Sequence, residues 1–298
     1  MTPRILPAVD WSDVFSFQDY GALLQLVSNS IVAAAALGIV GGLIGVFVMQ
    51  RDMAFAVHGV SELSFAGAAA ALLFGGSVVA GSLIGAVAAA LIIGALGARA
   101  RDRNSVVGVL MPFGLGLGIL FLSLYDGRSA NRFSLLTGQI VSVSSPDLGW
   151  LIVISATVFG GLLLVWNPLR FDSLDPQAAE ARGVPTQRIS ILFMLLLGLI
   201  VAVAVHIIGA LLVMALLVTP AAAAMRVSHG PLAVPLLSAL FGLVSAVGGI
   251  LLAIAGTLPV SPYITTISFV IWGVCRLISW RRDRAVRLSG ERPRAVEA

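Results

Sequence analysis

The sequence predicts an all-α, polytopic membrane protein: a transmembrane helical bundle of eight or nine spans. Of its 298 residues, 59% are hydrophobic and 11% are charged, and the mean hydropathy is +1.04. A soluble domain has roughly 25% charged residues, and no soluble core of this size could bury so much apolar surface. The apolar residues also form long runs separated by short charged segments, as expected where lipid is the solvent.

Nine apolar runs are long enough to be considered as spans. They cover residues 23–49, 54–75, 79–98, 106–125, 148–166, 189–206, 210–224, 232–255 and 264–278. The first run is closed by Arg51 and Asp52, and the third by the basic segment "RARDR" at 99–103. We prefer nine spans, but eight are expected if the glycine-interrupted region 189–224 does not cross the membrane twice.

Two polar segments between the runs are long enough to form structure of their own. The first follows residue 125 and contains "FSLLTGQIV", which we interpret as a short interfacial helix. The second covers 169–188 and contains "DPQAAEARG". There Asp175 suits an N-cap, Pro176 a first helical turn and Gly183 a helix stop. We therefore predict a short surface helix in the second segment.

The arginines predict the orientation of the chain. With nine spans, one side receives Arg51, the 99–103 cluster, Arg170, Arg182, Arg188, Arg226 and the C-terminal run, and the other only Arg4, Arg128 and Arg132. The positive-inside rule then places the C-terminus in the cytoplasm and the N-terminus outside. We predict an extracytoplasmic tail over 1–20, a membrane domain over 21–280 and a basic cytoplasmic tail over 281–298. A formal charge of +4 is no signal for nucleic acid.

His58 and Glu62 are ionisable residues inside the second predicted span. Because they are four residues apart, they share one face of a helix, with Ser61 beside them. An ionisable residue near the bilayer centre costs on the order of 2.5–3.5 kcal/mol, so two on one face suggest a cavity or an ion path. Imidazole and carboxylate both bind divalent transition metals. Alternatively, Glu62 pairs with an arginine of another span, or both residues lie near the interface.

Other polar residues carry weaker signals. His206 ends the sixth span beside an "IIG" turn, where a histidine is more often an interfacial or packing residue than a ligand. The sequence contains no H-E-x-x-H, no G-x-S-x-G and no G-x-x-x-x-G-K-[ST]. Because the phosphate-binding loop is missing, the chain cannot hydrolyse ATP itself. If it pumps a substrate, a partner must supply the energy.

The order of these features resembles the membrane permease subunits of ATP-binding-cassette importers for zinc, manganese and iron. The resemblance covers roughly residues 21–280. Four stretches carry it: "GLIGVFVMQRDMAFAVHGVSELSFAG" (42–67), "FSLLTGQIVSVSSPDL" (133–148), "LDPQAAEARGVP" (174–185) and "IIGALLVMALLVTPAAAA" (207–224). No single motif is decisive, but four in the same order are fairly specific.

The resemblance implies roles for two of these stretches. In the family, the segment that matches 174–185 docks into a groove of the cytoplasmic ATPase, and Asp175, Pro176, Ala179 and Gly183 match its pattern. The family usually has Asp where this chain has His58 and His where it has Glu62, while Ser61 matches. The exchange keeps one imidazole and one carboxylate in reversed order. The position of His206 also differs, since the family often has Lys or Met near it.

The resemblance implies a transport subunit, not an enzyme, in the bacterial cytoplasmic membrane. It would move divalent transition metal ions (zinc, manganese or iron) inward past His58 and Glu62, with Ser61 in support. The partners implied are two ATPase subunits, an extracytoplasmic metal-binding protein and a second permease copy or a paralogue. No cofactor would be held permanently, because a transport site must release its substrate. The alternatives are a carrier driven by an ion gradient and an intramembrane enzyme using His58 and Glu62 as an acid–base pair.

Overall fold

A computed structural model describes residues 20–96, 100–127, 135, 140, 143–210, 212–256 and 260–288. The elements of this part of the chain are α-helices. In order they are α2 (Tyr20–Leu26), α3 (Ser28–Gln50), α4 (Ala54–Leu73), α5 (Val78–Leu96), α6 (Ala100–Leu124), α8 (Ser145–Leu164), α9 (Trp166–Leu174), α10 (Pro176–Ala181), α11 (Thr186–Ile208), α12 (Val213–Val227), α13 (Ala233–Ile254) and α14 (Val260–Leu288). The predicted all-α bundle is confirmed.

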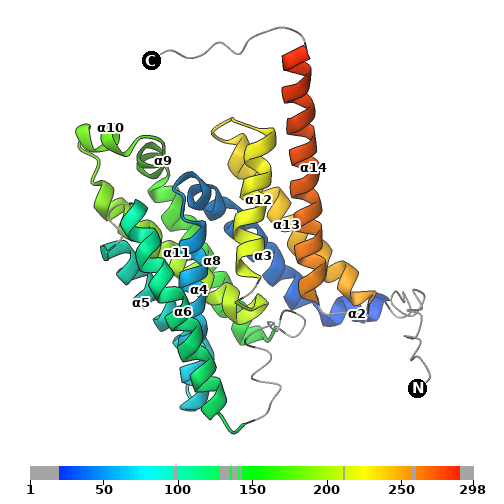
Figure 1. Ribbon diagram of the computed structural model, residues 1–298. Coiled ribbons are helices and arrows are strands. Elements are labelled where there is room, and N and C mark those ends of the chain that lie inside the picture. The colour runs from blue at the N-terminus through cyan, green and yellow to red at the C-terminus, as the bar shows by residue number, and fades with distance from the viewer. Residues whose placement is uncertain are drawn as a thin grey trace, which may run out of the picture.

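Eight of the described helices are long and apolar enough to cross a membrane: α3, α4, α5, α6, α8, α11, α13 and α14. The predicted span that is not among them is the seventh, 210–224, which corresponds to α12 and has only 15 residues. At 1.5 Å per residue it is about 22 Å long, shorter than a bilayer core of about 30 Å. In Figure 1, α12 runs back toward the end of the bundle that carries α9 and α10. It is therefore a short return pass after α11.

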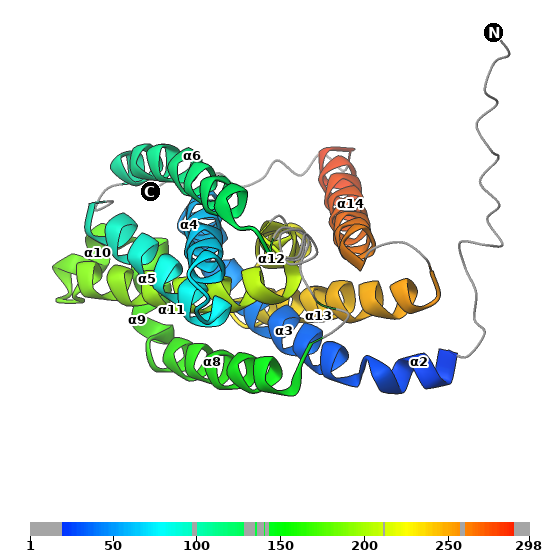
Figure 2. The same ribbon diagram turned by 90° about the horizontal axis from the view of Figure 1, so that it is seen from below.

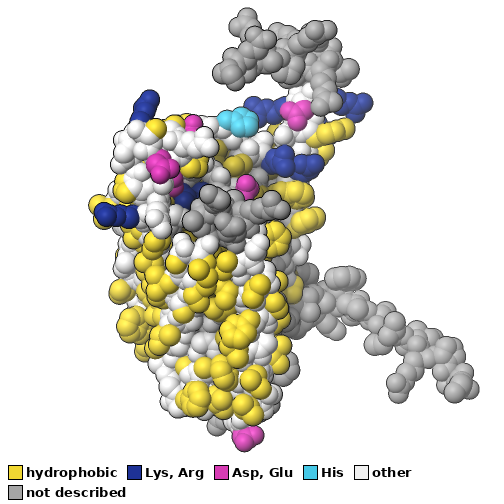
Figure 3. Space-filling view, turned by 60° about the vertical axis from the view of Figure 1, so that its left-hand side comes forward, with side chains coloured by type: hydrophobic (Ala, Val, Ile, Leu, Met, Phe, Trp, Pro, Cys, Tyr) yellow, Lys and Arg dark blue, Asp and Glu magenta, His cyan; other side chains and the backbone are white. Residues whose placement is uncertain are grey.

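The two ends of the bundle differ in charge. Figure 1 places α2 at one end, and α10 and the C-terminal end of α14 at the other. Figure 3 shows the dark blue arginine side chains gathered at the α10 end, above a broad hydrophobic face. By the positive-inside rule, the α10 end is cytoplasmic. The end that carries α2 is then expected to be extracytoplasmic, and α2 and the C-terminal end of α14 lie at opposite ends of the bundle, as the predicted sides of the two termini require.

Small residues let the central helices approach closely. Gly38 on α3 and Gly242 on α13 face each other so tightly that a Cβ atom on either would overlap the backbone carbonyl of the other. One turn along, the Ser238 hydroxyl donates a hydrogen bond of 2.6 Å to the Gly42 carbonyl oxygen. In a membrane, where lipid is as apolar as the side chains, such close contact and hydrogen bonding drive helix association. The glycines of 38–45 therefore have a packing role.

Replacing Gly242 by alanine should destabilise the α3–α13 contact. The added methyl group meets backbone atoms, and overpacking of this kind typically costs about 1–3 kcal/mol. We expect a lower midpoint of thermal unfolding for Gly242→Ala, measured on the purified protein in detergent. The matched control is Gly108→Ala on α6, where a Cβ meets nothing within 4 Å. An equal loss of stability in both variants would contradict the packing role.

Several element boundaries differ from the sequence-based expectation. The last helix continues to Leu288, so the start of the predicted tail 281–298 is helical. The polar segment 169–188 contains a second helix before α10, α9, which the sequence did not predict. At the N-terminus a break near Val27 separates α2 from α3. Residues 1–19 of the predicted tail lie outside the described residues, as does the predicted helix "FSLLTGQIV" apart from residues 135 and 140.

Candidate functional site

Helix α4 carries the predicted His58–Glu62 pair near the centre of the bundle. In Figure 2 α4 lies between α6, α11 and α12. Because the two residues are one helical turn apart, their side chains meet: His58 Nε2 is 3.4 Å from Glu62 Oε1. Two ligand atoms that each lie about 2.1 Å from one tetrahedral ion are about 3.4 Å apart. The pair is therefore spaced so that both atoms can bind the same cation.

The burial of this pair is unusual for polar groups. The Glu62 side chain is only 4% exposed, whereas His58 is 25% exposed and reaches the edge of the packed helices. Within the described residues, His58 Nδ1 and Glu62 Oε2 are buried and have no hydrogen-bond partner. No arginine pairs with Glu62 there, so the alternative of an inter-span ion pair is not supported. A buried polar group without a partner is costly, which points to a ligand that the chain itself does not supply.

Ser61 ties this site to the turn between α11 and α12. Its side chain is fully buried, and its hydroxyl donates a hydrogen bond of 3.1 Å to the Ala210 carbonyl oxygen. The turn begins at Gly209, whose φ of +84° is in the region that favours glycine. The hydroxyl of Ser61 is thus bonded to backbone, and it holds the middle of α4 against the broken α11–α12 segment.

The predicted surface helix is present as α10. The Asp175 side chain caps it by accepting a hydrogen bond of 2.9 Å from the Ala178 amide, and Pro176 occupies the first turn. Gly183 follows the helix with a φ of +82°. Ala179 is fully buried against the bundle. The exposed face is left to Pro176, Gln177, Glu180 and Ala181, so α10 presents a short ridge to the cytoplasm.

A buried ion pair connects the segment before α10 to the start of α4. Arg51, in the turn after α3, contacts Asp172 of α9 at 2.5 Å, and their side chains are only 10% and 3% exposed. The Arg51 guanidinium also lies 5.6 Å from the centre of the Phe193 ring on α11. Because α4 begins three residues after Arg51, the ion pair ties α9 to the start of the helix that carries His58. The sequence did not single out Asp172, which lies in the polar segment 169–188.

A cavity of about 580 Å³ opens beside this ion pair at the cytoplasmic end. It lies between the α3–α4 turn and the segment from α9 to the start of α11. Its polar lining includes Arg51, Asp52, Asp172, Gln177 and Glu180. Residues of α10 therefore line the rim of a polar recess, so α10 is not packed on all sides.

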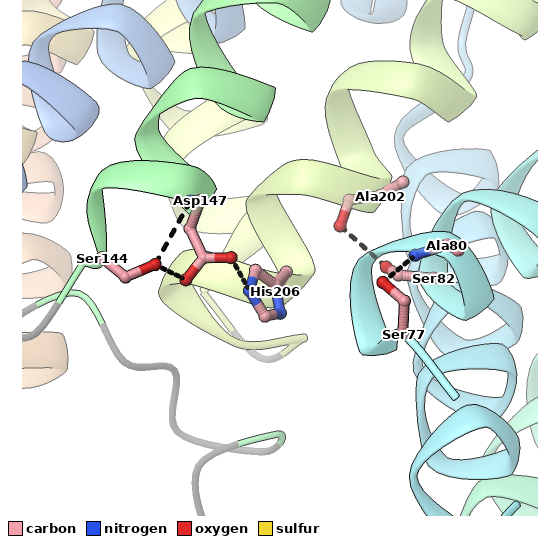
Figure 4. Close-up of polar contacts among 7 residues, drawn as sticks. All are labelled: Ser77, Ala80, Ser82, Ser144, Asp147, Ala202 and His206. Atoms are coloured by element: carbon pink, nitrogen blue, oxygen red, sulfur yellow. Dashed lines mark hydrogen bonds and ion pairs between the residues drawn. The ribbon is translucent and has the colours of Figure 1, made fainter. Parts of the chain in front are cut away.

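A second histidine–carboxylate pair lies at the opposite end of the bundle. Figure 4 shows Asp147, in the first turn of α8, pointing toward His206 in the last turn of α11. His206 Nε2 is 3.3 Å from Asp147 Oδ1, and the Ser144 hydroxyl bonds the other carboxylate oxygen at 2.5 Å. The sequence singled out His206 but gave no sign that Asp147, 59 residues away, would meet it.

The described residues contain no group of three or more His, Cys, Asp or Glu side chains that could hold a metal ion. Each of the two pairs thus supplies two ligand groups from this chain. Within the described residues, neither pair has a third His, Cys, Asp or Glu side chain beside it. Two protein ligands are typical of weak, exchangeable binding, whereas structural sites are closed by four.

Comparison with known proteins places the chain in a family. The chain is 29% identical to the manganese transport system membrane protein MntC of Halalkalibacterium halodurans over 93% of this chain and 99% of that protein. It is 20% identical to the high-affinity zinc uptake system membrane protein ZnuB of Haemophilus influenzae, over 78% and 89%. The solved PsaBC from Streptococcus pneumoniae in complex with Fab aligns with a TM-score of 0.79 and 25% identity, covering 92% of this chain and 99% of that one. The profile of the ABC 3 transport family matches residues 23–278, and the chain belongs to that family.

Proposed function

We propose that this chain is the permease subunit of an ATP-binding-cassette importer that moves divalent transition metal ions, manganese, zinc or iron, into the bacterial cytoplasm. The observation that carries the proposal is the His58–Glu62 pair: two ligand groups 3.4 Å apart, buried in a membrane helix, each with an atom that lacks a partner in the described chain. The similarity to permeases named for manganese and zinc transport supports the choice of ion.

In this account His58 and Glu62 coordinate the ion only briefly. His58 is the more exposed of the two and Glu62 is almost fully buried, so the ion is held between one accessible ligand and one buried ligand. A second copy of the chain, or a paralogue, contributes the remaining ligands across a central path. Ser61 keeps α4 against the α11–α12 turn through its bond to Ala210. An extracytoplasmic binding protein delivers the ion.

Energy comes from a separate ATPase pair that docks on the ridge of α10. ATP binding closes the ATPases and pulls on α10, and α9 passes this motion through Asp172 to Arg51. Arg51 precedes α4, so the motion reaches the helix that holds the ion. The path then opens alternately to each side. The chain itself performs no hydrolysis and is a transport subunit.

Metal uptake in cells that lack this chain tests the proposal. Zinc, manganese and iron are offered side by side, and the wild-type chain is returned on a plasmid. We expect one of the three to lose high-affinity uptake and to regain it with the wild-type chain. Unchanged uptake of all three would overturn the proposal. Uptake that persists after ATP depletion but stops when the proton gradient is dissipated would favour a gradient-driven carrier.

Docking on α10 predicts a selective loss of coupling in Asp175→Ala. Removing the cap of this short helix costs about 1 kcal/mol locally, and α10 frays without disturbing the membrane helices. We expect weaker co-purification of the ATPase and a several-fold fall in uptake, with an unchanged thermal midpoint of the chain alone. Thr157→Ala on α8, whose exposed hydroxyl donates to the Val153 carbonyl oxygen of the same helix, is the control. Full coupling in Asp175→Ala would argue that α10 is only a connecting helix.

A further inference from the structure

The extracytoplasmic pair, His206 and Asp147, has the same ligand chemistry as the inner pair. Each pair joins an imidazole Nε2 to a carboxylate oxygen. The two atoms are 3.3 Å apart in the outer pair, His206–Asp147, and 3.4 Å apart in the inner pair, His58–Glu62. Both values fit two ligand atoms on one ion (about 3.4 Å for a tetrahedral site). The inner pair lies within one helix, whereas the outer pair bridges α8 and α11. The outer arrangement therefore depends on the fold and not on helical spacing alone.

The outer carboxylate is held in place by its surroundings. Ser144 caps α8 by accepting a hydrogen bond from the Asp147 amide at 3.3 Å, and its hydroxyl donates to Asp147 Oδ2 at 2.5 Å. This leaves Oδ1 directed at His206, as Figure 4 shows. The Asn29 side chain of α3 also donates to the Val143 carbonyl oxygen at 3.4 Å. Ligating carboxylates are commonly oriented by such outer hydrogen bonds.

Access and position also suit an ion that arrives from outside. Asp147 is 31% exposed and His206 is 15% exposed, so an ion can reach both. His206 lies four residues before Ala210, whose carbonyl oxygen is bonded to Ser61 between His58 and Glu62. The α11–α12 turn therefore connects the outer pair to the inner one.

We propose that His206 and Asp147 form a second divalent-cation site, at the extracytoplasmic end, which receives the ion before the His58–Glu62 pair does. The choice of cation rests on the proposed function, whereas the site itself rests on the geometry of α8 and α11. Water completes the coordination, which keeps binding weak and exchange fast. The alternative is that His206 and Asp147 form a simple ion pair that ties α8 to α11 and binds no metal ion.

Manganese binding to the purified full-length chain in lipid nanodiscs distinguishes the cation site from the simple ion pair. The inner pair is first removed by His58→Ala and Glu62→Ala, which leaves His206 and His229 as the only histidines. The chain is then titrated with Mn²⁺ alone, and electron spin-echo spectroscopy detects a coordinated imidazole nitrogen. We expect one Mn²⁺ per chain with nitrogen coupling. Adding His206→Ala should remove the coupling and weaken binding at least about tenfold.

Two further variants keep the test decisive. Asp147→Asn preserves the shape of the side chain and its bond to Ser144, yet it should also weaken Mn²⁺ binding. His229→Ala, on the exposed cytoplasmic loop after α12, should leave both binding and coupling unchanged. If the chain without the inner pair binds no Mn²⁺, or if His206→Ala leaves the coupling intact, the outer site is refuted. Unchanged uptake of zinc, manganese and iron in cells that lack the chain, with Mn²⁺ still bound at His206 of the purified chain, would overturn the proposed function alone.

Discussion

Replacing Glu62 by glutamine should reduce metal uptake at least about 100-fold, because loss of even an outer partner of a metal ligand costs about 10–100-fold. Glutamine keeps the size of the side chain and removes its charge, so α4 should pack as before. Glu62 is 4% exposed and contacts His58. We expect His58→Ala to act as strongly, and the double variant to be little worse than either single one, because both side chains bind the same ion.

The measurement is initial-rate uptake of radiolabelled manganese or zinc at matched protein levels in the membrane. His229→Ala is the control, since this histidine lies on an exposed loop. A third variant exchanges the two residues, His58→Asp with Glu62→His, and restores the order usual in the resembling family. It should retain a measurable part of the uptake because the ligand types are unchanged. Normal uptake by both single variants would make the pair structural.

Replacing Asp172 by alanine should destabilise the chain more than any other single change at the cytoplasmic end. The substitution leaves the Arg51 guanidinium buried without its carboxylate partner. Breaking a buried ion pair from one side typically costs about 3–5 kcal/mol. We expect a clearly lower thermal midpoint and, in the protein that remains folded, uncoupling of ATP hydrolysis from uptake. Both quantities are measured on the purified complex of chain and ATPase.

Two comparisons test the cause of that loss. Asp175→Ala removes an exposed carboxylate three residues away and should leave the thermal midpoint unchanged. The double variant Arg51→Met with Asp172→Leu replaces the pair by apolar groups of similar size, which is often neutral in a buried site. It should recover stability but not coupling. Recovery of both would show that the pair only packs α9 against the bundle and transmits nothing.

Much of the architecture follows from the apolar pattern. Runs of apolar residues over 54–75 and 232–255 became α4 and α13 nearly at the predicted bounds. The α10 helix was predictable as well, because Asp175, Pro176 and Gly183 are local signals of a helix start and stop. The apolar composition of this segment could not show whether α12 spans the whole membrane. Its 15 residues begin after Gly209, and only the structure shows where the α11–α12 break lies.

The candidate site was predictable only where one helix contains all of it. His58 and Glu62 are four residues apart, so helical periodicity alone places them together. Asp172 and Arg51 are 121 residues apart, and Asp147 and His206 are 59 apart. Their pairing depends on how α9 packs beneath α3 and how α8 packs on α11. Nothing in the local sequence of an aspartate near a span end distinguishes a solvated residue from a paired one.

The central claim is that ATP drives a divalent metal ion past His58 and Glu62. The most direct measurement is metal accumulation in proteoliposomes that contain the chain, its ATPase and the binding protein, with the membrane potential and proton gradient dissipated. The account predicts accumulation with ATP, none without it, and almost none with ATP when Glu62 is replaced by glutamine. Accumulation that is independent of ATP, or that is equal for the wild type and Glu62→Gln, would contradict it.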